Sequence, residues 1–147
     1  MAIVAANHVL ANNLLVVDDD QFQGDEIVRV AGDSGIENIS RAGNESEAYQ
    51  IIASQEFSLA VVDIMLSSEE RREGLRVITE LRRLQPDCRI IALTTRGRND
   101  IGVQALNLGA DDFVCGEWKY ISWSELLRQR LDLWRGVARS REVVKPT

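Results

Sequence analysis

The sequence predicts a single α/β domain in which five parallel strands form a sheet with helices on both faces. Short, continuous apolar runs recur along the chain, which is typical of strands buried on both sides. A segment with helical spacing of its apolar residues follows each run. Such alternation of strand and helix favours a parallel sheet. The length of 147 residues fits one domain, and no linker-like stretch marks a second.

The five predicted strands differ in strength. The second is the weakest, because Ile36 and Ile39 are its only large apolar residues. The third is the clearest, since four apolar residues lead directly into Asp63. In sequence order, the expected strands are 14–17, 36–42, 59–63, 89–93 and 112–115.

Local signals mark where the predicted helices begin and end. Asn44 is a suitable N-cap, and Glu47 stands at the capping-box position. Gly32 and Gly35 are expected to close the first helix, and Pro86 stops the third. The apolar stripes of the helices are Ile27, Val30 and Ala31; Ala48, Ile51 and Ile52; Val77, Ile78, Leu81 and Leu84; Ile101, Ala105 and Leu108; and Trp123, Leu127, Leu131 and Trp134.

Composition excludes several classes of function. The net charge of −6 argues against unaided binding to nucleic acid or to an anionic membrane. No apolar stretch is long enough for a membrane span, and the start lacks the basic region of a signal peptide, so we expect a cytoplasmic protein. His8 is the only histidine, which disfavours His-based catalysis. Cys88 and Cys115 lack metal-site spacing and are expected to be reduced, buried side chains.

The expected domain boundaries follow from the strand and helix pattern. Residues 1–13 are interpreted as an N-terminal extension, residues 14–138 as the domain, and residues 139–147 as a polar C-terminal tail.

Polar residues follow three of the predicted strands at the edge where each strand ends. Asp18 and Asp19 follow the first, Asp63 ends the third, and Thr94 follows the fourth. If these strands are neighbours, their ends converge on one pocket. Grouped carboxylates repel one another, and Mg²⁺ is a hard cation that relieves this repulsion. The alternative is that each Asp only forms a turn or caps a helix, as we expect for Asp20.

Four motifs together resemble the receiver domains of two-component response regulators. The motifs are LLVVDDD at 14–20, VVDIML at 61–66, IIALTT at 90–95 and GADDF at 109–113. The resemblance covers most of the chain, from Leu14 to Val137. It implies a flavodoxin-like, doubly wound (βα)5 fold with strand order 2-1-3-4-5.

The resemblance also implies a function. It implies a signalling module that accepts a phosphoryl group from a histidine kinase or phosphotransfer protein in the presence of Mg²⁺, without other enzymatic activity. The implied roles are phosphoacceptor for Asp63; metal ligands for Asp18, Asp19, Asp63 and the backbone carbonyl of Met65; and switch residues for Thr94 and Phe113.

The sequence departs from the family pattern at Gly116. The family has a lysine here, whose ammonium group would pair with Asp63 and with the phosphoryl oxygens. Lys119 is one candidate replacement, and Arg71 or Arg72, from the long charged loop that ends before the helix of Gly74, is another. For each of these side chains the alternative is a solvated loop residue. We expect Gly116→Lys to strengthen the response to phosphorylation.

Partner contacts are expected on one face. In the family, the fourth helix, fifth strand and fifth helix form the common surface for a downstream protein or for a homodimer. Trp118 and Tyr120 precede the last helix and either cap the core or contact a partner. No direct contact with nucleic acid or membrane is expected.

Two competing functions remain open. A pseudo-receiver would keep the acidic pocket but bind partners independently of phosphorylation. A small nucleotide- or flavin-binding α/β enzyme is the third reading. Gly97 and Gly102 have the spacing of a phosphate-binding loop, but Val103 and Gln104 replace the Lys-Ser/Thr pair that such a loop needs.

Overall fold

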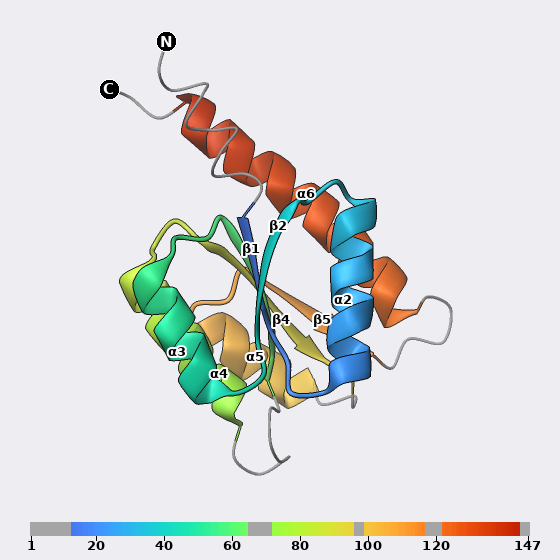
Figure 1. Cartoon of the computed structure of the whole chain (residues 1–147), viewed down its shortest axis with the longest axis vertical. Coiled ribbons are helices and arrows are strands. Elements are labelled where there is room, and N and C mark those ends of the chain that lie inside the picture. Colours follow the sequence, from blue (N-terminus) through green and yellow to red (C-terminus); the bar gives the residue numbers. More distant parts are fainter. Residues whose placement is uncertain (1–12, 65–71, 96–98, 117–121, 145–147) are drawn as a thin grey trace.

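A five-stranded parallel sheet of order β2-β1-β3-β4-β5 forms the centre of the protein (Figure 1). The computed structural model describes residues 13–64, 72–95, 99–116 and 122–144. The sheet and its order confirm the predicted fold class. The strands are β1 (Asn13–Val17), β2 (Asn38–Ala42), β3 (Leu59–Asp63), β4 (Arg89–Thr94) and β5 (Asp112–Cys115).

Helices cover both faces of the sheet (Figure 1). Two of them, α2 and α6, pack against each other on one face, and α3, α4 and α5 cover the other. This arrangement explains why the central strands β1, β3 and β4 consist mainly of buried apolar residues, because helices cover both of their faces. The helices are α2 (Gln21–Asp33), α3 (Glu45–Ser54), α4 (Glu73–Leu84), α5 (Asn99–Asn107) and α6 (Trp123–Val144).

Alternate residues of the central strands feed two separate cores. Leu14 and Val16 of β1 face α2 and α6, whereas Leu15 and Val17 face the three helices on the other side. The same alternation holds along β3 and β4. Burial on both faces fixes the register of each central strand, since a slip of one residue would exchange its two sets of side chains between the cores.

Several local predictions at helix ends are confirmed. The Asn44 side chain accepts a hydrogen bond from the Glu47 amide at 2.8 Å and so caps α3. The Glu47 carboxylate accepts from the Gly43 amide at 2.7 Å, one residue earlier than in a capping box. Asp20 caps α2, as predicted, by accepting from the Gln23 amide at 3.0 Å.

Other boundaries differ from the prediction. Gly32 lies inside the last turn of α2, and Gly35 alone ends the helix, with the positive φ of 85° that glycine tolerates. The last helix does not end near Gly136 but continues to Val144, and its final turns extend beyond the edge of the sheet (Figure 1). Leu84 and Leu108 are 45% and 42% exposed, because each lies at the end of its stripe, beyond the reach of the sheet.

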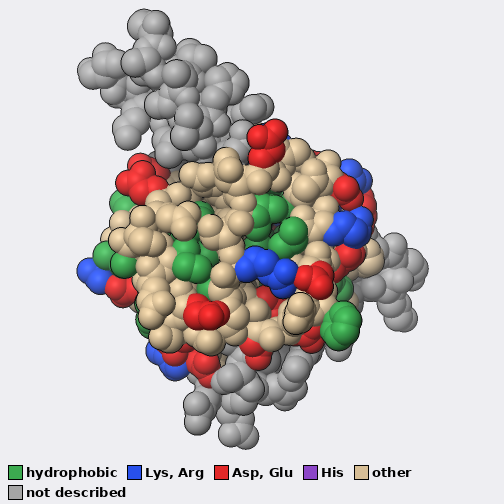
Figure 2. All heavy atoms as spheres, viewed as in Figure 1, with side chains coloured by type: hydrophobic (Ala, Val, Ile, Leu, Met, Phe, Trp, Pro, Cys, Tyr) green, Lys and Arg blue, Asp and Glu red, His purple; other side chains and the backbone are tan. Residues whose placement is uncertain are grey.

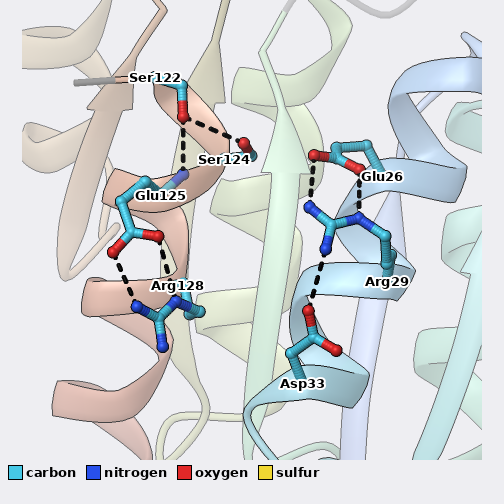
Figure 3. Close-up of polar contacts among 7 residues, drawn as sticks. All are labelled: Glu26, Arg29, Asp33, Ser122, Ser124, Glu125 and Arg128. Atoms are coloured by element: carbon cyan, nitrogen blue, oxygen red, sulfur yellow. Dashed lines mark hydrogen bonds and ion pairs between the residues drawn. The ribbon is translucent and has the colours of Figure 1, made fainter. Parts of the chain in front are cut away.

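The neighbouring helices α2 and α6 carry ion pairs along their exposed surfaces (Figure 3). On α2, Arg29 contacts Glu26 at 2.7 Å and Asp33 at 2.9 Å. On α6, Arg128 contacts Glu125 at 2.8 Å. All these pairs join residues of one helix, and exposed pairs of this kind contribute little to stability because water and salt screen them. They support the two helices rather than the packing between them.

The face seen in Figure 2 carries acidic and basic side chains interspersed with apolar ones, and the basic ones do not merge into one patch. Among the described residues, no helix has the length and apolarity that a membrane span requires.

Candidate functional site

Asp18 and Asp63 lie side by side at the carboxyl edge of the sheet. The parallel pairing of β1 with β3 places Val17 beside Val62, so the residues that follow them are also neighbours. Carboxylate oxygens of Asp18, Asp19 and Asp63 all lie within 4.8 Å of one another. The structure therefore brings together the three acidic residues that the sequence predicts to form one pocket.

The three carboxylates differ in their environment. Asp18 and Asp63 are buried, with 6% and 8% of their surface exposed, while Asp19 is exposed. Burial raises the pKa of Asp18 from 3.8 to about 6, and the nearby charges of Asp19 and Asp20 add to this rise. Hydrogen bonds from the Asp20 amide and from Gln23 act in the opposite direction. Two buried carboxylates and one exposed carboxylate form an oxygen-rich site of the kind that a hard divalent cation prefers.

The loop from β1 to α2 is fixed by its own hydrogen bonds. The Asp20 amide donates to Asp18 Oδ1 at 2.9 Å, and the Gln23 amide donates to the capping carboxylate of Asp20. The first turn of α2 is thus tied directly to the acidic pocket. Asp20 has the structural role that the sequence predicts, and the group of carboxylates that could hold a metal ion does not include it.

Gln23 is a site residue that sequence reasoning missed. Its Nε2 donates to Asp18 Oδ2 at 2.5 Å and to Asp63 Oδ2 at 3.3 Å. Its Oε1 accepts from the Thr95 hydroxyl at 3.0 Å. The available signal was its place in the first helical turn after the acidic pair, since side chains on a helix lean toward its N-terminus and here toward the strand ends.

The end of β4 supplies two hydroxyl residues to this edge. Thr94, the predicted switch residue, is 1% exposed and pairs with Cys115 of β5. Asp63 pairs with Leu93, so Thr94 lies one residue beyond the position of Asp63 on the neighbouring strand. Thr95 follows and reaches the pocket through Gln23. The prediction named Thr94 and overlooked Thr95.

Gly116 packs directly against the backbone of Thr95. A Cβ added at this glycine would lie 2.6 Å from Thr95 Cα and 2.9 Å from its carbonyl oxygen. The Gly116 amide also donates to the Thr94 carbonyl at 2.7 Å. The structure thus gives a steric reason against our expectation for Gly116→Lys, because any side chain here must move the backbone that carries Thr95. The Thr95 backbone can approach this position so closely because Gly116, and not a lysine, stands there.

Phe113, at the predicted switch position, is partly buried and packs against the core on the side of α5. A Cβ on Gly102 of α5 would lie 2.2–2.4 Å from three atoms of the Phe113 ring. The absence of a side chain at Gly102 therefore makes room for this ring. Its position inside a helix, against an aromatic side chain, argues against the phosphate-binding loop of the enzyme hypothesis.

The start of α4 lies against the backbone at the end of β3. The Gly74 amide donates to the Ile64 carbonyl at 2.9 Å, and a Cβ at Gly74 would lie 2.1 Å from the Asp63 carbonyl oxygen. Only glycine allows this approach. The Arg72 side chain donates to Gln104 of α5 at 3.3 Å, which supports its interpretation as a loop residue rather than as a replacement for lysine. Met65, Arg71, Trp118, Lys119 and Tyr120, as well as His8, lie outside the described residues.

Comparison with known proteins identifies one family over most of the chain. The family model described as the response regulator receiver domain matches residues 14–128. The transcriptional regulatory protein CusR of Escherichia coli K12 is 30% identical over 126 residues, which are 85% of this chain and 52% of CusR. The chemotaxis protein CheY of Bacillus subtilis is 25% identical over 105 residues, which are 71% of this chain and 85% of CheY. The chain also spans 21% of a putative NtrX-like response regulator of Rickettsia bellii, at 28% identity over 69% of this chain.

Solved structures give the same fold. A response regulator protein from Burkholderia pseudomallei, which contains a phosphorylated aspartic acid, a calcium ion and citrate, superposes with a TM-score of 0.67 at 27% identity. That match covers 92% of this chain and 76% of the other. A CheY-like receiver domain protein from Methanospirillum hungatei superposes with a TM-score of 0.67 at 26% identity, over 86% of this chain and 98% of the other.

Proposed function

The chain belongs to the family of response regulator receiver domains, and on that premise we propose that Asp63 accepts a phosphoryl group from a histidine kinase or a phosphotransfer protein. Receiver domains are signalling modules of two-component systems. In this proposal the chain has no enzymatic activity beyond its own phosphorylation, and the phosphorylation takes place in the cytoplasm.

One observation carries the proposal. The register of β1 and β3 sets the buried carboxylates of Asp18 and Asp63 side by side, with Asp19 completing a group whose oxygens lie within 4.8 Å. A buried pair of carboxylates is costly unless a cation or a proton neutralises it. The site therefore suits a reaction in which a cation and a phosphoryl group are bound together.

Asp18, Asp19 and Asp63 would hold Mg²⁺, together with the backbone carbonyl of Met65 that the family pattern assigns to this role. When bound, the cation neutralises negative charge on the transferring oxygens. A carboxylate oxygen of Asp63 forms a bond to phosphorus while the bond from phosphorus to the donor's histidine nitrogen breaks. The electron pair of that bond stays on the imidazole. The hydroxyl of Thr94, one residue beyond Asp63 on the adjacent strand, would hydrogen-bond the phosphoryl group.

We further propose that a downstream protein, or a second copy of this chain, binds the face formed by α5, β5 and α6. Three exposed apolar side chains near or on α5 support this choice: Val103, Leu106 and Leu108 are 57%, 43% and 42% exposed. On α6, Leu133 is 49% exposed. Phe113 of β5 packs beside α5 and would link the phosphorylation site to this face. The proposal includes no direct contact with nucleic acid.

The test is incorporation of a phosphoryl group from acetyl phosphate, measured by intact-protein mass spectrometry with and without Mg²⁺. We expect a metal-dependent adduct of one phosphoryl group in the wild type and none in Asp63→Asn. Asp132→Asn, which removes an exposed carboxylate of α6, is the control and should be phosphorylated like the wild type. An adduct that persists in Asp63→Asn, or no adduct in the wild type with Mg²⁺, would contradict the proposal.

The second candidate is an interaction domain that works without phosphorylation. It is favoured by the packing of Gly116 on Thr95, which leaves no space at this position for the family's lysine. This candidate predicts that beryllofluoride and Mg²⁺ leave the amide spectrum of α5 and β5 unchanged. The first candidate predicts shifts at Thr94 and Phe113.

A further inference from the structure

The carboxamide of Gln23 contacts both buried carboxylates of the acidic pocket. Its nitrogen donates to one oxygen of Asp18 at 2.5 Å and to one oxygen of Asp63 at 3.3 Å. A primary amide nitrogen carries two hydrogens, so a single group serves both carboxylates. These carboxylates come from the ends of two different strands, β1 and β3, and Gln23 joins them from a third element, α2.

A second contact fixes the orientation of this amide. The Thr95 hydroxyl donates to Gln23 Oε1 at 3.0 Å, so the oxygen side of the amide is bound and the nitrogen side is turned toward the acids. Thr95 is in turn held against Gly116, where even a Cβ would lie 2.6 Å from Thr95 Cα. The amide is therefore held in a position that depends on the glycine at the site of the family's lysine.

We propose that Gln23, held by Thr95, competes with the divalent cation for the oxygens of Asp18 and Asp63. This inference rests on the proposed function, since it takes the acidic pocket as the metal site. A cation that used these two oxygens as ligands would have to displace the Gln23 N–H groups that bind them. Gln23 is thus a positioning residue that holds the metal-free pocket together and sets how strongly the cation binds.

The competition also links metal entry to β4. When the amide leaves the carboxylates, its bond to Thr95 must break or reorganise, because both bonds belong to one planar group. Thr95 follows Thr94 directly, so a change at the metal site reaches the end of β4 through Gln23. In this chain the neutral amide of Gln23 donates to the carboxylates of Asp18 and Asp63. In the family pattern, a lysine ammonium group pairs with the phosphoacceptor instead.

The test measures the Mg²⁺ dissociation constant by calorimetry in the full chain. Gln23→Met keeps the size of the side chain but removes the amide, and we expect it to bind Mg²⁺ roughly tenfold more tightly, the factor that corresponds to about one hydrogen bond to a charged group. Thr95→Val removes the hydroxyl that holds the amide and should give a smaller gain in the same direction. Thr95→Ser restores the donor and should bind as the wild type does.

Gln21→Ala is the matched control, because Gln21 lies in the same helical turn and its side chain is exposed. It should leave the dissociation constant unchanged. Nuclear magnetic resonance of the Gln23 side-chain amide gives a second readout: its two proton signals should shift when Mg²⁺ is titrated into the wild type. This measurement needs no variant, so it stands even if Gln23→Met does not fold.

The outcomes separate this inference from the proposed function. Suppose that the wild type binds Mg²⁺ and Asp63→Asn does not, while Gln23→Met binds Mg²⁺ no more tightly than the wild type. This result would overturn the role of Gln23 but would still support the metal site. Gln23 amide signals that do not respond to bound Mg²⁺ overturn the role of Gln23 as well. If neither the wild type nor any variant binds Mg²⁺, the proposed metal site fails and the inference fails with it.

Discussion

Asp18 shows how burial changes the chemistry of a single residue. It follows β1 directly, so its carboxylate lies against the core edge and only 6% of the residue is exposed. Water reaches this carboxylate poorly, so its negative charge is costly and its pKa is raised. For the same reason the charge would be stabilised by a bound cation. Asp19, one residue later, is exposed.

This difference predicts a pH dependence of stability. The pKa of Asp18 is about 6 in the folded protein, compared with the ordinary value of 3.8 that applies to the unfolded chain. The folded state therefore binds the proton of this carboxyl group more tightly than the unfolded state does. Ionisation of Asp18 therefore lowers the free energy of unfolding. This destabilisation is zero well below pH 3.8, grows as the pH rises, and reaches its full size above about pH 6.

In metal-free buffer, Asp18→Asn should therefore gain stability relative to the wild type as the pH rises through this window, by up to about 3 kcal/mol. Urea unfolding in the presence of EDTA, repeated across the pH range, measures the difference. A difference that does not change with pH would contradict the assignment. Saturating Mg²⁺ should stabilise the wild type but not the variant, because the cation favours the ionised carboxylate.

Gly116 illustrates a second effect at the residue scale. From the sequence, its role is defined by the lysine that it lacks, and adding the lysine looks like a repair. The structure shows a contact of its own, in which the glycine allows the Thr95 backbone to approach. The close packing at the end of β4 and β5 therefore requires a residue without a side chain at this position.

At the scale of elements, glycines determine how closely helices approach the strands of the site. Gly74 brings the start of α4 onto the backbone of Asp63 and Ile64, and Gly102 lets α5 accept the ring of Phe113. These helices lie on the same face of the sheet. A side chain at either position would move its helix outward from the strands.

Gly102→Ala is predicted to destabilise the fold by roughly 1–3 kcal/mol, because the new methyl group overlaps the Phe113 ring. Gly32→Ala is the matched control, since Gly32 also lies in a helix but has no atom within 4 Å of the added Cβ. It should stabilise the fold by about 0.5–1 kcal/mol through helix propensity alone. Guanidinium unfolding of both variants measures the contrast, and the same sign of change in both would refute the packing role of Gly102.

At the scale of the whole molecule, the sheet separates two cores that depend on each other through the central strands. Cys88 lies at the edge of one of these cores, 1% exposed, and Arg82 of α4 donates to its carbonyl oxygen at 2.8 Å. Burial raises the pKa of the Cys88 thiol to about 12. The thiolate is the reactive form, so Cys88 combines low access with low reactivity.

We therefore predict that Cys88 reacts with a thiol reagent only when the fold opens around it. In a Cys115→Ala background, labelling near pH 8 should be far slower than in denaturant and should accelerate as urea approaches the unfolding transition. Rapid labelling of the folded protein would mean that this core opens locally. Both cysteines are buried in the structure, which confirms the expectation that they are core side chains.

The sequence by itself determined the class of the fold, the succession of strands and helices, and the three acidic residues of the pocket. These features are local: an apolar run with its terminal carboxylate, a helical stripe and a cap are each encoded within a few residues. Parallel strands then bring their carboxyl ends to one edge, so the grouping of Asp18, Asp19 and Asp63 follows from the fold class.

Only the tertiary structure decided the contacts that adjust this pocket. Gln23 and Thr95 are 72 residues apart, and their bond depends on how α2 and β4 are placed on the sheet. The approach of Gly116 to Thr95 and of Gly102 to Phe113 likewise depends on strand register and helix packing. Such contacts involve ordinary residues with no local signature, because their meaning comes from the distance between segments that the sequence places far apart.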